Sequence, residues 1–338
     1  MSAMVINTNR RTVLKYAGAL SATGLAGCLG GSDGDYPDGT ITLIVPYGEG
    51  GGTDIYARHF GDLLSNILDV PFQIDNVPGG GGVIGVTEAY NSQPDGYTYL
   101  FGVGPGVGMF QYLADPDSVS AEYEEFEPVG VMGAGTHVVA AGPDFEGDYA
   151  DIVDQYADGE LSTIGGQQPG SNVSVSAVLM QDDHGATWEE YVGYDGSAPV
   201  GQAVASGEVP VGLSSESALE PFDEEGNLTV VADLSGEGGI ATDIPSVVDY
   251  GYDDQDFISI VYRLLLGPPG TDEDQREVVE DALAEAVESE ETEQWVENTG
   301  NDAEFGDQDR VREVWHGRLE EIPEQVDMDA VRELMGVE

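Results

Sequence analysis

The chain has 338 residues, of which 40% are hydrophobic, and a net charge of −55 from 65 acidic and 10 basic residues. The length suits two lobes of ordinary domain size, and the periodic hydrophobic content argues against a disordered chain. Repulsion at this charge destabilises a compact chain unless salt screens it, which indicates a protein from a halophile. Nucleic acid is excluded as a partner because almost no basic residues remain to contact phosphates.

Residues 1–27 are predicted to be an export signal. Arg10 and Arg11 precede an apolar run that is too short to cross a bilayer as a mature helix. Arg10-Arg11-Thr12-Val13-Leu14-Lys15 resembles the twin-arginine signal, which exports folded proteins. Once this segment is removed, the chain contains no lysine, and its net charge becomes 7 − 65 = −58.

Cys28 is the only cysteine, and it follows Leu25-Ala26-Gly27 in the pattern of a lipobox. This pattern predicts lipidation of Cys28, with residues 28–39 as a flexible tether; a chance cysteine in a small-residue run is the alternative. A single cysteine excludes an internal disulfide and a cysteine metal site.

The first predicted unit is a strand, a glycine loop and a helix. Strand-forming residues 41–45 end at Pro46, a glycine run follows, and Thr53 or Asp54 stands at the expected N-cap. The helix that follows carries an apolar stripe of Ile55, Phe60, Leu63, Leu64, Ile67 and Leu68. Such a loop directs backbone N–H groups and a helix dipole at one point, which favours anion binding.

The next segments repeat this alternation. A short strand at 71–78 leads into Gly79–Gly82 and a helix from Val83, and a strand at 97–102 follows the turn 94–96. The alternation predicts an α/β domain with a mostly parallel sheet.

The central part predicts a second lobe with its own glycine loop. Residues 129–141 form one apolar strand, and 143–159 contain a helix. The opening pattern then recurs as strand 161–164, loop 165–172 and helix 173–181. Further expected strands are 192–194, 209–213 and 228–234, with a helix at 199–205.

The C-terminal part is expected to be mainly helical. Residues 257–266 form a buried strand, and a capping-box pattern at 271–274 begins a helix with an apolar stripe. A last amphipathic helix carries Val311, Val314, Trp315, Leu319 and Ile322.

No constellation of residues indicates a cofactor, a metal or catalysis. A phosphate-binding P-loop needs a lysine, and the dinucleotide fingerprint lacks its third-glycine spacing. The G-x-S-x-G match at 30–34 lies in the tether with no strand before it. The four histidines have no metal-ligand spacing, so they are expected to be surface or packing residues. Glycine loops that hold a carboxylate through backbone N–H groups and hydroxyls remain, with tight turns alone as the alternative.

Five motifs resemble the solute receptors of tripartite tricarboxylate transporters. Val45 to Asp54 looks like the first ligand loop of that family, and Asp75 to Gly85 looks like its second, with Val77 in place of an arginine. The remaining three are Pro94-Asp95-Gly96-Tyr97-Thr98, Tyr194-Asp195-Gly196-Ser197-Ala198-Pro199 and Asp243-Ile244-Pro245-Ser246-Val247.

The resemblance implies an α/β, two-lobed type II periplasmic-binding-protein-like fold with two crossover strands and a ligand cleft. Lobe I would comprise residues 40–140 and 257–338, and lobe II residues 141–256. The crossings are placed near 136–143 and 257–266. It also implies a monomeric receptor that takes a small di- or tricarboxylate, or a related organic acid, and passes it to large and small membrane subunits.

Ligand-binding residues follow by position in these motifs. The first jaw would be Tyr47, Gly51, Gly52, Thr53, Asp54, Asn76, Gly80 and Gly81. The second would be Gly165, Ser171, Asn172, Tyr194 and Ser197, with Ser214 and Ser215 as further candidates. The loop 165–172 departs from the family pattern, so the identity of the solute does not carry over. Arg263 is expected to pair with a neighbouring carboxylate, and binding of an acidic ligand group is its alternative.

An enzyme on this scaffold and a sensory or structural surface lipoprotein remain the competing functions.

Overall fold

Strands and helices alternate along the chain, and ten strands form two five-stranded sheets within the described residues. The computed structural model describes residues 36–50, 52–236 and 244–337. The first sheet has the order β2 (Phe72–Asn76), β1 (Ile41–Val45), β3 (Thr98–Gly104), β10 (Val261–Gly267) and β4 (Glu127–Gly135). The second has the order β7 (Glu190–Tyr194), β6 (Thr163–Gln167), β8 (Val211–Ser215), β5 (His137–Ala141) and β9 (Thr229–Asp233). The predicted signal 1–27, Cys28 and Gly51 lie outside the described residues.

Both sheets are mixed and follow the same scheme. In the first, β1 pairs in parallel with β2 and β3, while β10 is antiparallel to β3 and β4. In the second, β6 pairs in parallel with β7 and β8, while β5 is antiparallel to β8 and β9. Because β10 follows the whole second sheet in sequence yet pairs in the first, the first sheet is built from both ends of the chain.

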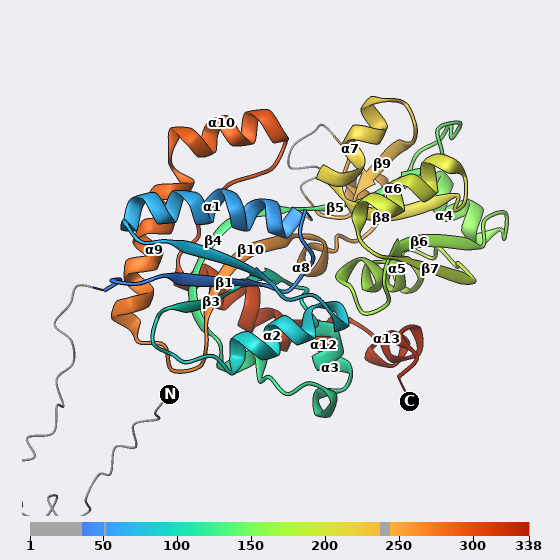
Figure 1. Ribbon diagram of the computed structural model, residues 1–338. Coiled ribbons are helices and arrows are strands. Elements are labelled where there is room, and N and C mark those ends of the chain that lie inside the picture. Colours follow the sequence, from blue (N-terminus) through green and yellow to red (C-terminus); the bar gives the residue numbers. More distant parts are fainter. Residues whose placement is uncertain (1–35, 51, 237–243, 338) are drawn as a thin grey trace, which may run out of the picture. The chain divides into compact units, whose positions relative to one another are not determined.

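Helices cover both faces of the first sheet (Figure 1). One face packs against α1 (Gly52–Leu68) and α9 (Glu273–Val287), whose buried residues share one core with β1. The other packs against α2 (Val83–Tyr90), α3 (Met109–Ala114) and α12 (Arg318–Gln325). Further helices are α8 (Asp256–Ser259), α10 (Glu290–Thr299), α11 (Gln308–Val311) and α13 (Met328–Met335), with a π-helical turn over Arg312–Gly317.

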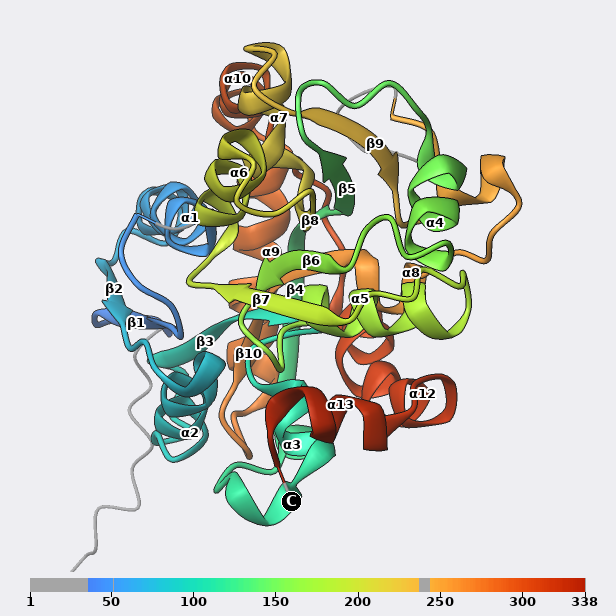
Figure 2. The same ribbon diagram turned by 90° about the vertical axis from the view of Figure 1, so that its right-hand side faces the viewer.

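The second sheet is covered in the same way (Figure 2). Helices α4 (Tyr149–Ala157) and α5 (Asn172–Asp182) bury one core against it. Helices α6 (Ser197–Ser206) and α7 (Glu216–Glu224) bury another on the opposite face. None of the helices among the described residues combines the length and apolar character needed to cross a bilayer.

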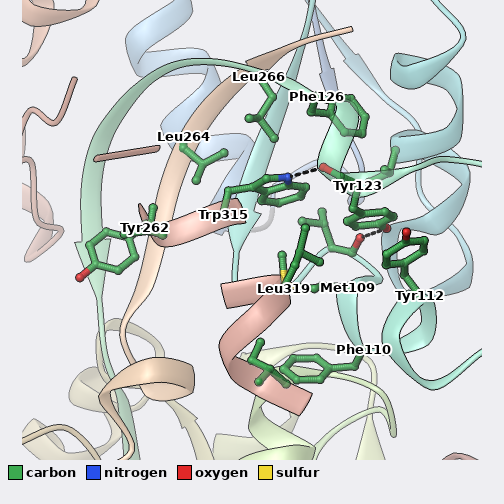
Figure 3. Packing of buried hydrophobic residues seen from close by; sticks show 14 of the residues in the cluster. Met109, Phe110, Tyr112, Tyr123, Phe126, Tyr262, Leu264, Leu266, Trp315 and Leu319 are labelled. Atoms are coloured by element: carbon green, nitrogen blue, oxygen red, sulfur yellow. Dashed lines mark hydrogen bonds between the residues drawn. The ribbon is translucent and has the colours of Figure 1, made fainter. Parts of the chain in front are cut away.

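Trp315 organises the core beneath α12 (Figure 3). Its indole N–H donates to the Tyr123 carbonyl at 3.0 Å, and its ring stacks on Tyr123 at 5.5 Å between centroids. Tyr112 stacks on the other side of Tyr123 at 4.8 Å. The buried Trp315 thus has its polar atom satisfied, and the predicted apolar stripe of the last helix is confirmed as a core surface.

The predicted single strand 129–141 is wrong. It is two strands, β4 and β5, which belong to different sheets and are separated only by Thr136. Both halves are apolar because both are buried, so composition alone does not reveal where the chain leaves one sheet for the other.

The predicted strand 257–266 is also partly wrong, because its first residues form the helical turn α8. Asp254 Oδ1 accepts the Asp256 N–H at 3.2 Å, a local bond that starts a turn rather than a strand. The strand β10 begins only at Val261. Helices α3, α7, α10 and α13 were not predicted at all.

Candidate functional site

The loop after β1 presents its backbone to solvent. Gly48, Gly50 and Gly52 are exposed, and a Cβ on any of them would meet no atom within 4 Å. Gly50 has a φ of 77°, which favours glycine. Thr53 lies half-buried in the first turn of α1. Since the first N–H groups of a helix have no intrahelical partner, this loop offers donors beside the positive end of the α1 dipole.

Asp54 holds this loop in place. Its carboxylate accepts hydrogen bonds from the Gly50 N–H at 2.8 Å, from Arg58 Nε at 2.8 Å and from Asn76 Nδ2 at 2.9 Å. Burial alone would raise the pKa of Asp54, but the bonds from Arg58, Gly50 and Asn76 outweigh it and keep that pKa below its usual value. Asn76 Nδ2 also donates to the Tyr47 carbonyl at 3.1 Å. Both predicted ligand residues therefore position the loop through internal bonds.

The loop after β2 needs glycine for its backbone conformation. Gly79, Gly80, Gly81 and Gly82 all have positive φ, at 131°, 59°, 64° and 106°. Gly80 and Gly81 are exposed, whereas Gly82 is buried. Three residues on, a Cβ at Gly85 would lie 2.8 Å from Pro46 Cα, so the loops after β1 and β2 pack directly together.

A third loop, residues 104–108 after β3, was missed from the sequence. Val107 has a φ of 45°, which is strained for a β-branched residue. The Tyr47 hydroxyl accepts the Val107 N–H at 3.2 Å, and the Tyr123 hydroxyl donates to the Val107 carbonyl at 2.6 Å. Burial raises the pKa of Tyr47 to about 12, so its hydroxyl stays protonated. The run Gly102-Val103-Gly104-Pro105-Gly106-Val107-Gly108 directly after a strand was the available signal.

The predicted loop 165–172 begins later than expected. Gly165 and Gly166 lie inside β6, are buried, and allow close packing. A Cβ at Gly165 would lie 2.8 Å from Val209 Cγ2, and one at Gly166 would clash with the Tyr191 hydroxyl oxygen. The structure therefore gives Gly165 a packing role within the sheet.

The ends of β6 and β8 meet at the start of α6. Ser197 Oγ accepts from Gln167 Nε2 at 2.8 Å and from Ser215 Oγ at 3.4 Å. Tyr194, at the end of β7, directs its hydroxyl to Glu208 Oε1 at 3.0 Å instead. Burial together with that glutamate raises the pKa of Tyr194 to about 12.

Ser171 and Asn172 form the N-terminus of α5. Ser171 caps the helix by accepting the Ser174 N–H at 3.1 Å. Asn172 is buried, and its Nδ2 lies 3.4 Å from Nε2 of His137, the first residue of β5. Ser214 Oγ is fully buried and has no hydrogen-bond partner among the described residues.

The predicted residues thus form two groups. Tyr47, Asp54 and Asn76 are joined by hydrogen bonds at the ends of β1 and β2, with Gly52, Thr53, Gly80 and Gly81 in the same loops. Ser197 and Ser215 are joined at the second sheet, where Ser171 and Asn172 form the α5 N-terminus. No hydrogen bond between described residues links the two groups.

Other features lie outside these loops. The described residues contain no cluster of three or more His, Cys, Asp or Glu side chains arranged for a metal. A pocket of about 360 Å³ is lined by β4, β10 and residues 304–310, and none of the predicted ligand residues contributes to it. Arg263 on β10 forms no ion pair with a described carboxylate, contrary to expectation.

Residues 56–319 match the family model described as "Tripartite tricarboxylate transporter family receptor". The protein BugT of Bordetella pertussis is 28% identical over 243 residues, which cover 70% of this chain and 73% of BugT. MatC of Rhodopseudomonas palustris, solved with bound malate, has a TM-score of 0.66 at 21% identity, covering 89% of this chain and 98% of MatC. A second R. palustris protein, solved with adipate, has a TM-score of 0.69 at 21% identity over 90% of this chain and 99% of its own.

The family match extends over most of the described residues and includes the second sheet and every strand of the first except β1. The two mixed sheets have the fold of two-lobed periplasmic solute-binding proteins. This chain belongs to the receptors of the tripartite tricarboxylate transporter family.

Proposed function

We propose that this protein is an extracytoplasmic receptor that captures a small organic carboxylate and delivers it to the membrane subunits of a tripartite transporter. The loops after β1 and β2 would hold one carboxylate, and the opposing end of the solute would meet the α5 and α6 N-termini. Malate and adipate in two related structures support a carboxylate as the solute class.

The exposed glycine loop at the N-terminus of α1 carries this proposal. Apart from the exposed Glu49, its residues are glycines, so the backbone N–H groups that Asp54 does not engage are the available donors, and the helix dipole adds positive potential. In a chain without a mature lysine, such uncharged donors provide a way to hold an anion that the surrounding acidic surface would otherwise repel.

A thermal-shift panel tests the function. We expect the purified protein in concentrated KCl to be stabilised by at least one di- or tricarboxylate, because a ligand at ~100 times its dissociation constant adds about 2.7 kcal/mol to the unfolding free energy. Neutral sugars serve as the control ligands. A broad carboxylate panel without any shift would overturn the proposal.

Thr53 provides a local test of the first loop. Replacing Thr53 by Val keeps the shape of the side chain and removes its hydroxyl, so we expect carboxylate binding to be lost while the unfolding midpoint changes little. Titration calorimetry measures the affinity. Thr87→Val on α2, also half-buried, is the matched control and should bind normally. Unchanged affinity in Thr53→Val would remove this residue from the site.

We further propose that Cys28 carries a lipid that anchors the monomeric receptor to the outer face of the cytoplasmic membrane. The lobes would be residues 40–140 with 257–338, and residues 141–256, as the sequence predicts. Cys28→Ser should release the protein from membranes into the medium of the producing cells. Retention of this variant in the membrane fraction would contradict the lipid anchor.

A further inference from the structure

Arg263 is the exception among the arginines of the described chain. Six others each form an ion pair with an aspartate or glutamate, namely Arg58, Arg276, Arg310, Arg312, Arg318 and Arg332. The sequence has 65 acidic residues, yet none of the described ones lies within ion-pair distance of Arg263. A cation without an anion in so acidic a chain requires an explanation.

The Arg263 guanidinium lies next to the first crossing between the sheets. Its carbon is 4.1 Å from the centroid of the Tyr56 ring on α1. On the other side, Nη1 lies 3.1 Å from the position that a Cβ would take at Gly135, the last residue of β4. Nη1 is buried and has no hydrogen-bond partner among the described residues. A ring face attracts the charge but does not satisfy the in-plane N–H donors, so one donor stays unsatisfied.

A second unsatisfied donor lies two residues after Gly135. His137 is only 4% exposed, and its Nδ1 has no hydrogen-bond partner in the part of the chain that the structure describes. Burial, reinforced by the charge of Arg263, lowers the pKa of His137 to about 3, so the ring is neutral. Since Asn172 Nδ2 is a donor, His137 Nε2 must accept from it, and this assigns the ring proton to Nδ1. Two donors at one crossing therefore lack an acceptor.

We propose that Arg263, together with His137, forms a charged subsite that accepts one carboxylate of a dicarboxylate solute. This inference rests on the proposed carboxylate-receptor function. The Arg263 guanidinium lies over the Tyr56 ring, and Tyr56 is four residues beyond the first residue of α1, an axial rise of about 6 Å at 1.5 Å per residue. A short dicarboxylate spans that separation, with one end on the neutral N–H donors and the other on Arg263.

The subsite determines selectivity between ligands of equal length. The N–H groups of the loop donate hydrogen bonds to any carboxylate. A guanidinium adds a charge-assisted hydrogen bond only when a second carboxylate reaches it. The protein should therefore prefer adipate to hexanoate, and malate to 2-hydroxybutyrate. Arg263→Gln should remove this preference by weakening dicarboxylate binding about 10- to 150-fold while monocarboxylate binding stays unchanged.

The experiment is titration calorimetry of the purified protein with those two ligand pairs in concentrated KCl. Arg312→Gln is the matched control, because it removes the same charge from an exposed arginine whose recorded partner is Asp309. Gly135→Ala is a second variant that keeps the charge but presses on Nη1, and it should also reduce the preference for dicarboxylates. Near-UV circular dichroism verifies folding of each variant.

The outcomes separate the two proposals. If the wild type binds neither class of acid, the receptor function and the subsite both fail. If the wild type prefers dicarboxylates and both Arg263→Gln and Gly135→Ala keep that preference, the subsite fails while the receptor function stands. Equal weakening of both ligand classes by Arg263→Gln, in a folded variant, likewise overturns the subsite and assigns Arg263 a structural role.

Discussion

Asp54 shows how a single buried residue determines the shape of the first loop. Three donors from three parts of the chain converge on its carboxylate, which is only 2% exposed. The sequence identified Asp54 but not the direction of its side chain. An aspartate after a glycine loop can equally well accept hydrogen bonds from its own loop or face a ligand. The signal in the sequence was Arg58, four residues later, since this spacing places the two side chains together on one helix face.

Asp54→Asn should destabilise the protein by about 1–3 kcal/mol, since an amide group would face donors that then lack an acceptor. Urea denaturation measures this loss, and Asp62→Asn on the exposed side of α1 is the control. Because the folded pKa is depressed, the stabilisation by Asp54 is present above its unfolded pKa and is lost as the pH falls through the folded pKa. Equal stability of both variants at pH 7 would contradict this role.

His137 should make the fold sensitive to acid. Its folded pKa of about 3 lies below the value of 6.5 for an unperturbed histidine, so protonation favours the unfolded chain. Relative to His137→Gln, the wild type should lose about 2 kcal/mol of unfolding free energy between pH 7.5 and pH 5. Denaturation of both proteins at the two pH values in concentrated salt measures the difference. A constant difference across this range would contradict the prediction.

At the scale of elements, strand, glycine loop and helix units were predictable because strand composition, glycine runs and N-caps are local signals. The loops after β1 and β2 follow that prediction. Composition could not locate the break at Thr136, since two buried strands of different sheets share one composition; only the family resemblance placed a crossing near 136–143. Gly165 was assigned to a loop instead of a strand for a related reason. The sequence does not distinguish a glycine needed for packing against Val209 from a glycine in a ligand-binding loop.

The loops after β1 and β2 should differ in how well they tolerate an alanine in place of a glycine. Gly82→Ala should destabilise the protein by about 1–3 kcal/mol, because φ is 106° and the added Cβ would lie 3.1 Å from Val107 Cα. Gly48→Ala, which would meet no atom within 4 Å, should change stability by less than about 0.5 kcal/mol. Thermal unfolding of both variants measures the contrast. Similar midpoints would show that the 79–82 backbone relaxes freely.

At the scale of the whole molecule, the net charge affects stability more than the individual ion pairs do. Each recorded pair uses one of few arginines, which leaves most of the 65 acidic residues without a basic partner. Local pairs on the surface contribute little, typically about 0–1 kcal/mol each. Stability must therefore depend on the ions of the solvent more than on pairs within the chain.

The unfolding midpoint should rise steeply when KCl increases from 0.1 M towards 1 M, and level off as the screening length shortens from about 10 Å to about 3 Å. Circular dichroism at increasing temperature measures the midpoint in each salt concentration. Sucrose at matched osmolality is the control, because it does not screen charge. A midpoint that is independent of KCl would contradict the inferred adaptation to salt.

The position of Thr136 limits how the two sheets can rotate against each other. It is the one residue between β4 and β5, and its carbonyl accepts the Glu216 N–H at 3.0 Å while its hydroxyl bonds the Glu216 carboxylate at 3.3 Å. Any rotation of one sheet against the other must therefore occur, at the crossing from β4 to β5, through the backbone torsions of very few residues. Thr136 would then act as a hinge. The return from β9, which ends at Asp233, to β10, which begins at Val261, is far longer in sequence. We expect any such rotation to be centred close to His137, which follows Thr136, and to Arg263, whose Nη1 lies beside Gly135.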